Sequence, residues 1–147
     1  MTGDGDALAQ ACAERMWTDD LASQRLGMRV LDVGAGRALL AMLVRPDMVN
    51  GHGNAHGGFV FAVADSAFAF AFNSRNLRSV AYGCVITYLA PVRTGDELVA
   101  AAVERSLVGR TGTYDVTVTV GGTDGRTVVA EFRGTSRTVG GPLLDVG

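Results

Sequence analysis

The chain has 147 residues, which is enough for one domain with its own core and too few for two ordinary domains. Hydrophobic residues make up 48% and charged residues 19%, so the composition is that of a globular protein and not of a disordered one. The net charge of −2 lacks the basic surplus of a nucleic-acid-binding surface, and we expect no nucleic-acid partner.

Cysteine usage and hydropathy indicate the compartment. The two cysteines, Cys12 and Cys84, form no CxxC motif and no Cys/His cluster, so neither a disulfide framework nor a zinc site is predicted. No basic patch followed by an apolar run opens the chain, which argues against a signal peptide. The longest apolar stretch, residues 59–72, is shorter than the roughly 20 residues that cross a bilayer. We expect a soluble, cytoplasmic protein that has no membrane partner.

The first half of the chain is predicted to contain helices and one hairpin. Asp6 can cap a helix over residues 7–16, and Thr18, Asp19 and Asp20 offer the start of a second, short helix that ends near Gly27. Residues 28–33 and 37–44 have the pattern of two strands, which a tight Gly-Ala-Gly turn at 34–36 joins.

A loop rich in glycine and asparagine, residues 50–58, leads directly into residues 59–72. As a helix this second segment is apolar almost all the way round, so it must be buried on nearly every side. Strands are predicted after it over residues 80–90, 98–108, 114–120 and 126–139, with a hairpin loop at 121–125.

These elements predict an α+β fold in which a curved antiparallel sheet of about five strands wraps around one long central helix. We expect one domain over residues 1–147, with an N-terminal helical segment at 1–27 and a tail without pattern at 140–147. No internal repeat and no linker divides the chain.

Asp65 is the informative residue because it interrupts this apolar helix. An ionised carboxylate in such surroundings is paired, exposed at a subunit contact, or used in chemistry. Gly57 and Gly58 precede it at the helix N-terminus, where free N–H groups and the helix dipole can stabilise a developing oxyanion. His52 and His56 lie in the glycine loop; we expect them to organise the loop through hydrogen bonds or to contact a ligand, and we predict no metal site.

The loop and helix resemble the signature of the PaaI-type phenylacetyl-CoA thioesterases, which belong to the hotdog-fold superfamily. The resemblance covers residues 50–141 and rests on Asn50-x-His52-Gly53-x-x-His56-Gly57-Gly58, Asp65-Ser66-Ala67-Phe68-Ala69 and Asn73-Ser74. Weaker matches support it at Tyr88-Leu89-x-Pro91, Gly95-Asp96, Gly109-Arg110-Thr111-Gly112-x-Tyr114-Asp115 and Phe132-Arg133-Gly134.

The resemblance implies a hotdog fold that acts as a dimer of dimers and hydrolyses aromatic or related acyl-CoA thioesters without a cofactor. It implies that Asp65 activates water or attacks the thioester carbonyl, and that the Gly57 amide polarises this carbonyl. Asn50 and His56 match positions that line the same pocket. Ser66 stands where the family usually has threonine, and its hydroxyl is expected to place water.

Substrate contacts are expected from Gly58 and from arginines, which suit bidentate binding of phosphate. Arginine supplies all thirteen basic residues. The candidates for the phosphates of coenzyme A lie near element ends, and Arg75 and Arg110 are the two that we assign to substrate binding; the wider set is Arg75, Arg93, Arg110, Arg133 and Arg137.

Spacing along the helix predicts a site shared between two chains. Gly57 and Asp65 are eight residues apart, which is roughly 12 Å along a helix. One thioester carbonyl cannot touch both. Two antiparallel helices related by a twofold axis would place Gly57 of one chain opposite Asp65 of the other.

Three other interpretations compete. Residues 30–36, Val-Leu-Asp-Val-Gly-Ala-Gly, mimic the first motif of a Rossmann-type methyltransferase, but the alternating β and α units that this fold needs do not follow. A hotdog enoyl-CoA hydratase and a non-catalytic acyl-CoA-binding module remain open as alternatives. The sequence leaves undecided the preferred acyl group, the choice between base and nucleophile for Asp65, and the arginines that meet the phosphates.

Overall fold

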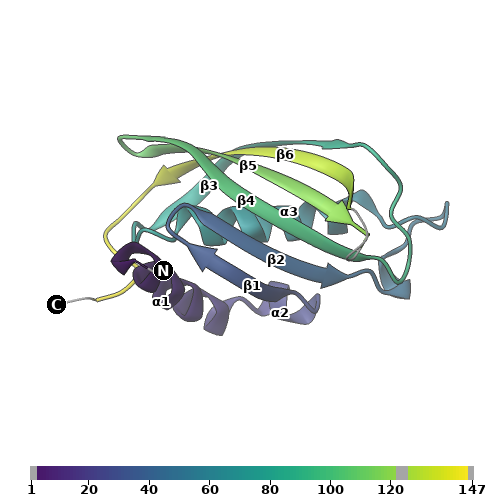
Figure 1. Cartoon of the computed structure of the whole chain (residues 1–147), viewed down its shortest axis with the longest axis horizontal. Helices are drawn as coiled ribbons and strands as arrows, with labels where there is room; N and C mark the ends of the chain where they lie inside the picture. The colour runs from purple at the N-terminus through teal and green to yellow at the C-terminus, as the bar shows by residue number, and fades with distance from the viewer. Residues whose placement is uncertain (1–2, 122–125, 146–147) are drawn as a thin grey trace.

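A computed structural model describes residues 3–121 and 126–145. Its six strands form one antiparallel sheet in the order β1-β2-β4-β5-β6-β3 (Figure 1). The strands are β1 (Arg29–Gly34), β2 (Arg37–Leu43), β3 (Ser79–Tyr88), β4 (Glu97–Val108), β5 (Thr111–Val120) and β6 (Thr127–Thr138). The helices are α1 (Asp4–Asp19), α2 (Leu21–Arg25) and α3 (Gly57–Phe72), with one 3-10 turn, η1 (Pro46–Met48).

The core lies between α3 and the curved sheet that wraps it (Figure 1). Half of the sixteen residues of α3 are buried, so the prediction of burial on nearly every side is met only in part within one chain. Phe68 is fully buried, and its ring lies 5.4 Å from that of Phe132 on β6. A Cβ added to Gly134 would lie 2.6 Å from the Phe68 ring, so glycine is what lets the helix approach the sheet this closely. The prediction of a curved antiparallel sheet around one central helix is therefore confirmed.

Six segments were predicted as strands and all six join one sheet, so the figure of about five strands is too low by one. The hairpin of β1 and β2 was expected from its pattern, and it joins the same sheet because β2 pairs with β4 from Arg37 opposite Val103 to Leu43 opposite Glu97. Alternation along a strand does not indicate which other strand will pair with it. The predicted hairpin loop at 121–125 falls largely outside the described residues.

The capping role predicted for Asp6 is wrong. The helix α1 begins earlier, after Gly3, and Asp6 lies in its first turn. The Asp6 carboxylate instead accepts a hydrogen bond from the Ala35 amide at 2.9 Å and pairs with Arg37 at 3.2 Å. These contacts attach α1 to the turn between β1 and β2, and the long-range partners outcompete a local cap. The second helix, α2, does begin after Asp20, whose side chain accepts from the Ser23 amide.

The two ends of the sheet differ in what covers them. Along β1, α1 packs beside the sheet, whereas α2 contacts α1 and α3 (Figure 1). At the other end β3 pairs only with β6, so one edge of a ten-residue strand has no strand beside it within residues 3–121 and 126–145. Val80 and Val85 on this strand are 46% and 70% exposed. Among the described residues, no helix is both long enough and apolar enough to cross a membrane.

Candidate active site

The loop before α3 is held by its own asparagine and by neighbouring backbone. The side-chain oxygen of Asn50 accepts from the amides of His52 at 2.9 Å and Asn54 at 3.2 Å, the usual way in which asparagine stabilises a turn. Backbone bonds from Ala55 to Val92 and from His56 to Met48, each 2.7 Å, attach the end of the loop to the rest of the fold. Asn50 therefore shapes the loop that delivers Gly57.

The first turn of α3 carries a glycine pair whose hydrogen bonds are unequal. His56 caps the helix, and its Nδ1 accepts from the Gly58 amide at 3.0 Å, which confirms a loop-organising role for this histidine. Tyr88 at the end of β3 donates its hydroxyl to the Gly57 carbonyl at 2.9 Å. The Gly57 amide has no acceptor among residues 3–121 and 126–145. An amide at a helix N-terminus that is left unpaired can donate to an incoming oxygen atom.

Asp65 is half-buried in the middle of α3 and is without a hydrogen bond or ion pair from any described residue. Burial raises the pKa of its carboxyl group, because the charged form loses water. Burial also raises the pKa of the nearby Cys84 thiol on β3, and the charge of Asp65 adds to this rise. Among the described residues, every fully buried side-chain oxygen has a hydrogen-bond partner. The Asp65 carboxylate has no partner, so its oxygens reach the surface and can meet water or a ligand.

Ser66 faces α2, whereas the neighbouring Asp65 lies near Cys84 on β3. Its hydroxyl lies 2.8 Å from that of Ser23 on α2, and Ser23 donates to a carboxylate oxygen of Asp20 at 2.7 Å. Ser23 is buried, and no sequence motif had indicated it. Two serines that are 43 residues apart in sequence give no signal that they will meet.

The two arginines assigned to substrate lie away from Gly57. Arg75 follows the opposite end of the sixteen-residue α3, roughly 24 Å along its axis. Its guanidinium makes two 3.1 Å bonds to Glu104. Arg110 is exposed in the turn between β4 and β5. Within one chain, the structure brings neither of them to the glycine pair.

A pocket of about 560 Å³ opens beside Gly57, and its size is typical of ligand pockets. It lies between the loop, the start of α3 and the end of β3. Polar and apolar atoms share its wall about equally; the polar side chains are those of Asn50, Asn54 and Tyr88, and the apolar ones are those of Ala55, Val60, Leu89, Ala90, Pro91, Val92 and Val129. Such a lining suits an apolar or aromatic group with one polar end.

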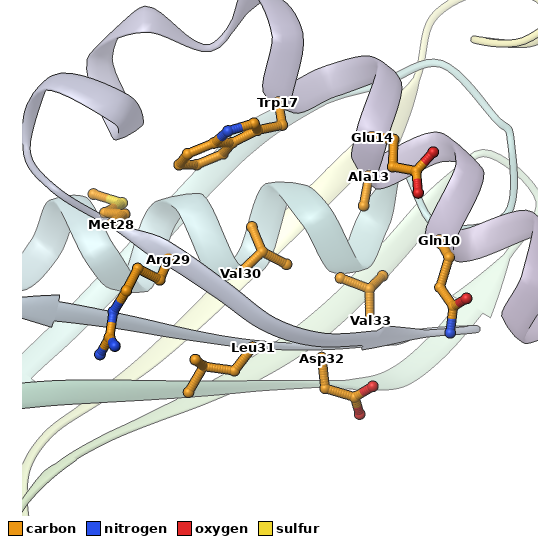
Figure 2. A pocket seen from close by; sticks show the side chains of 10 residues that line it. All are labelled: Gln10, Ala13, Glu14, Trp17, Met28, Arg29, Val30, Leu31, Asp32 and Val33. Atoms are coloured by element: carbon orange, nitrogen blue, oxygen red, sulfur yellow. The ribbon is translucent and has the colours of Figure 1, made fainter.

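A second hollow of about 520 Å³ lies between α1 and β1. Figure 2 shows Trp17 and Met28 at one end of it, with Val30 and Val33 directed toward α1. None of the predicted site residues lines it, so it is separate from the pocket at Gly57. In the described part of the chain, no three His, Cys, Asp or Glu side chains gather as a metal site would require.

Comparisons with known proteins agree with this geometry. Residues 52–127 match the family described as "Thioesterase superfamily". The chain is 38% identical to the acyl-coenzyme A thioesterase PaaI of Escherichia coli over 131 residues, which cover 89% of this chain and 91% of that protein. It is 34% identical to a putative esterase of Archaeoglobus fulgidus over 107 residues, 73% of this chain and 70% of the relative.

Solved structures extend the match to three dimensions. The E. coli PaaI protein from the phenylacetic acid degradation operon superposes with a TM-score of 0.89 at 37% identity, covering 93% of this chain and 97% of that one. A mutant of the phenylacetic acid degradation protein PaaI from Thermus thermophilus gives 0.75 at 42% identity, covering 80% of this chain and 98% of that one.

The chain belongs to the thioesterase superfamily. The predicted resemblance to PaaI-type enzymes, the hotdog fold and the classification as a thioester hydrolase are confirmed by these matches.

Proposed function

We propose that this protein hydrolyses an aromatic, phenylacetyl-CoA-like or related acyl-CoA thioester to the free acid and coenzyme A. The observation that carries the proposal is the unpaired Gly57 amide at the N-terminus of α3, beside a pocket of about 560 Å³ whose wall is both polar and apolar. The E. coli relative, which is named an acyl-coenzyme A thioesterase, supports the same substrate class.

In the proposed reaction the thioester carbonyl oxygen accepts a hydrogen bond from the Gly57 amide. This bond strengthens as the oxygen becomes negative in the transition state, so it lowers the barrier. The Asp65 carboxylate either takes a proton from the attacking water, or attacks the carbonyl itself to form a mixed anhydride that water then hydrolyses, which restores the carboxylate. In both routes the carbon–sulfur bond breaks and the thiolate of coenzyme A leaves. Asn50 and His56 act by holding the loop and the first turn of α3.

We propose further that each site takes Gly57 from one chain and Asp65 from its partner. The two groups are roughly 12 Å apart along α3, too far for one carbonyl. The half-buried residues around Asp65, such as Phe61, Ala62 and Ala69, form a stripe of α3 that the sheet leaves accessible. The ten-residue β3 beside it presents an edge that another chain can extend. A homodimer, doubled to a tetramer, follows from the family resemblance.

In this assembly we assign binding of the coenzyme A phosphates to Arg75 and Arg110. Both are distant from Gly57 of their own chain, so each site can take them from either protomer. Gly58 follows the Gly57 that lines the pocket, and its own amide is bonded to His56. The role of Ser66 in placing water rests on the family resemblance alone, since within one chain its hydroxyl is bonded to Ser23 on α2.

The test is release of free thiol from a panel of aromatic and aliphatic acyl-CoA thioesters. Asp65→Asn should lower kcat by at least about a hundredfold with much less change in KM, because base or nucleophile roles contribute roughly 10² to 10⁴-fold. Asp19→Asn is the matched control, since Asp19 is 71% exposed on α1. A mutant at position 65 that keeps more than about a third of the wild-type kcat contradicts the role of Asp65. A wild-type protein that binds acyl-CoA but releases no thiol is instead a binding module.

A further inference from the structure

The peptide group that links Gly57 to Gly58 is held at both ends by side chains. Its N–H, on Gly58, donates to Nδ1 of His56 at 3.0 Å. Its C=O, on Gly57, accepts from the hydroxyl of Tyr88 at 2.9 Å. Glycine pairs are otherwise the most freely rotating part of a backbone, so two bonds on one peptide plane remove much of that freedom.

Tyr88 also makes a steric contact with the same residue. A Cβ built on Gly57 would lie 3.0 Å from both Cζ and Oη of Tyr88, closer than side chains normally pack. The ring therefore covers the Cα of Gly57. This contact is a second reason for glycine at position 57, besides the approach of a ligand.

Resting on the proposed function, we propose that Tyr88 is a positioning residue for the oxyanion donor. The His56 amide is bonded to Met48, so the chain before Gly57 is held as well. Holding the Gly57–Gly58 peptide therefore restricts the rotation about Gly57, and with it the direction of the unpaired Gly57 N–H. A donor that is already aligned needs no reorganisation when the oxyanion forms. Tyr88 also lines the pocket of about 560 Å³, where the acyl group would sit.

Tyr88→Phe tests the hydroxyl alone, because the ring and its contact with Gly57 remain. Tyr88 is 50% exposed, so this variant is expected to fold. Loss of one hydrogen bond corresponds to about a three- to tenfold change. We expect kcat for acyl-CoA hydrolysis to fall by about this factor, with KM nearly unchanged, since the bond to the carbonyl matters most in the transition state.

Tyr82→Phe is the matched control. Tyr82 lies on the same strand and is 71% exposed, and its hydroxyl has no hydrogen-bond partner among residues 3–121 and 126–145. The control should keep wild-type kcat and KM. If both phenylalanine variants lost activity equally, or if neither did, the positioning role would be overturned.

A second measurement separates this inference from the proposed function. Exchange of the Gly58 amide hydrogen, which is bonded to His56, should be faster by NMR in Tyr88→Phe than in wild type and unchanged in Tyr82→Phe. This result supports the positioning role even if the wild type releases no thiol from any substrate, which would defeat only the hydrolysis. Unchanged exchange in Tyr88→Phe overturns the positioning role even in an active enzyme.

Discussion

A complementation experiment tests whether the active site spans two chains. Asp65→Asn removes the carboxylate from a chain and leaves its Gly57 amide intact. Gly57→Val damages the amide end, because even the first added carbon would lie 3.0 Å from the Tyr88 ring and the β-branched side chain narrows the approach to the N–H. Each purified mutant alone is expected to be nearly inactive.

The expected recovery follows from counting sites. If each site uses Gly57 from one chain and Asp65 from the other, a heterodimer has one doubly damaged site and one intact site. Random reassembly makes half of the dimers hetero, so recovery should reach about a quarter of wild-type activity.

The assay mixes the two mutants, unfolds and refolds them together, and measures thiol release against each mutant refolded alone. Mass spectrometry under native conditions establishes that heterodimers are present. If Gly57 and Asp65 of one chain served the same site, every site would carry one lesion. Recovery no greater than the average of the two parents, with heterodimers present, would refute the shared site.

Three further outcomes are expected. Because burial raises the pKa of Asp65, its ionised form destabilises the folded state, and Asp65→Asn should raise Tm at pH 7. This gain in Tm should vanish below pH 3.8, the ordinary pKa, where the carboxyl group is protonated in both states. An equal Tm of mutant and wild type at pH 7 would contradict the burial argument. Gly134→Ala should lower the free energy of unfolding in urea by about 1–3 kcal/mol, because the new carbon overlaps the Phe68 ring. An unchanged free energy of unfolding would mean that α3 can shift to make room. In calorimetry, desulfo-CoA should bind more weakly at high salt and to Arg75→Gln or Arg110→Gln. An affinity that changes neither with salt nor with either substitution would exclude these arginines from phosphate binding.

Local sequence patterns were enough to predict most elements and the loop that begins the site. The apolar residues of α3 recur on all sides of the helix, and alternation marks the strands, so both are readable from neighbours in sequence. The run from Asn50 to Gly58 likewise predicts a helix N-terminus with exposed amides. Its hydrogen bonds to His56 and Asn50 join residues no more than four positions apart.

The contacts that complete the site are long-range, and local patterns do not encode them. Tyr88 meets Gly57 across 31 positions, and Ser66 meets Ser23 across 43. The sequence shows a tyrosine at a strand end and a serine on a helix, but not which surfaces they will face.

The sequence by itself determined that a lone carboxylate would sit in an apolar helix behind a glycine-rich N-terminus, because hydrophobic periodicity and turn chemistry act over a few residues. Only the tertiary structure decided that β3 pairs with β6 and lies at the edge of the sheet, so that Tyr88 reaches the Gly57 carbonyl while Asp65 remains without a partner in the described chain. The strand order depends on how all six strands pack around α3. The free energy that favours one order comes from the whole packed core rather than from any one segment.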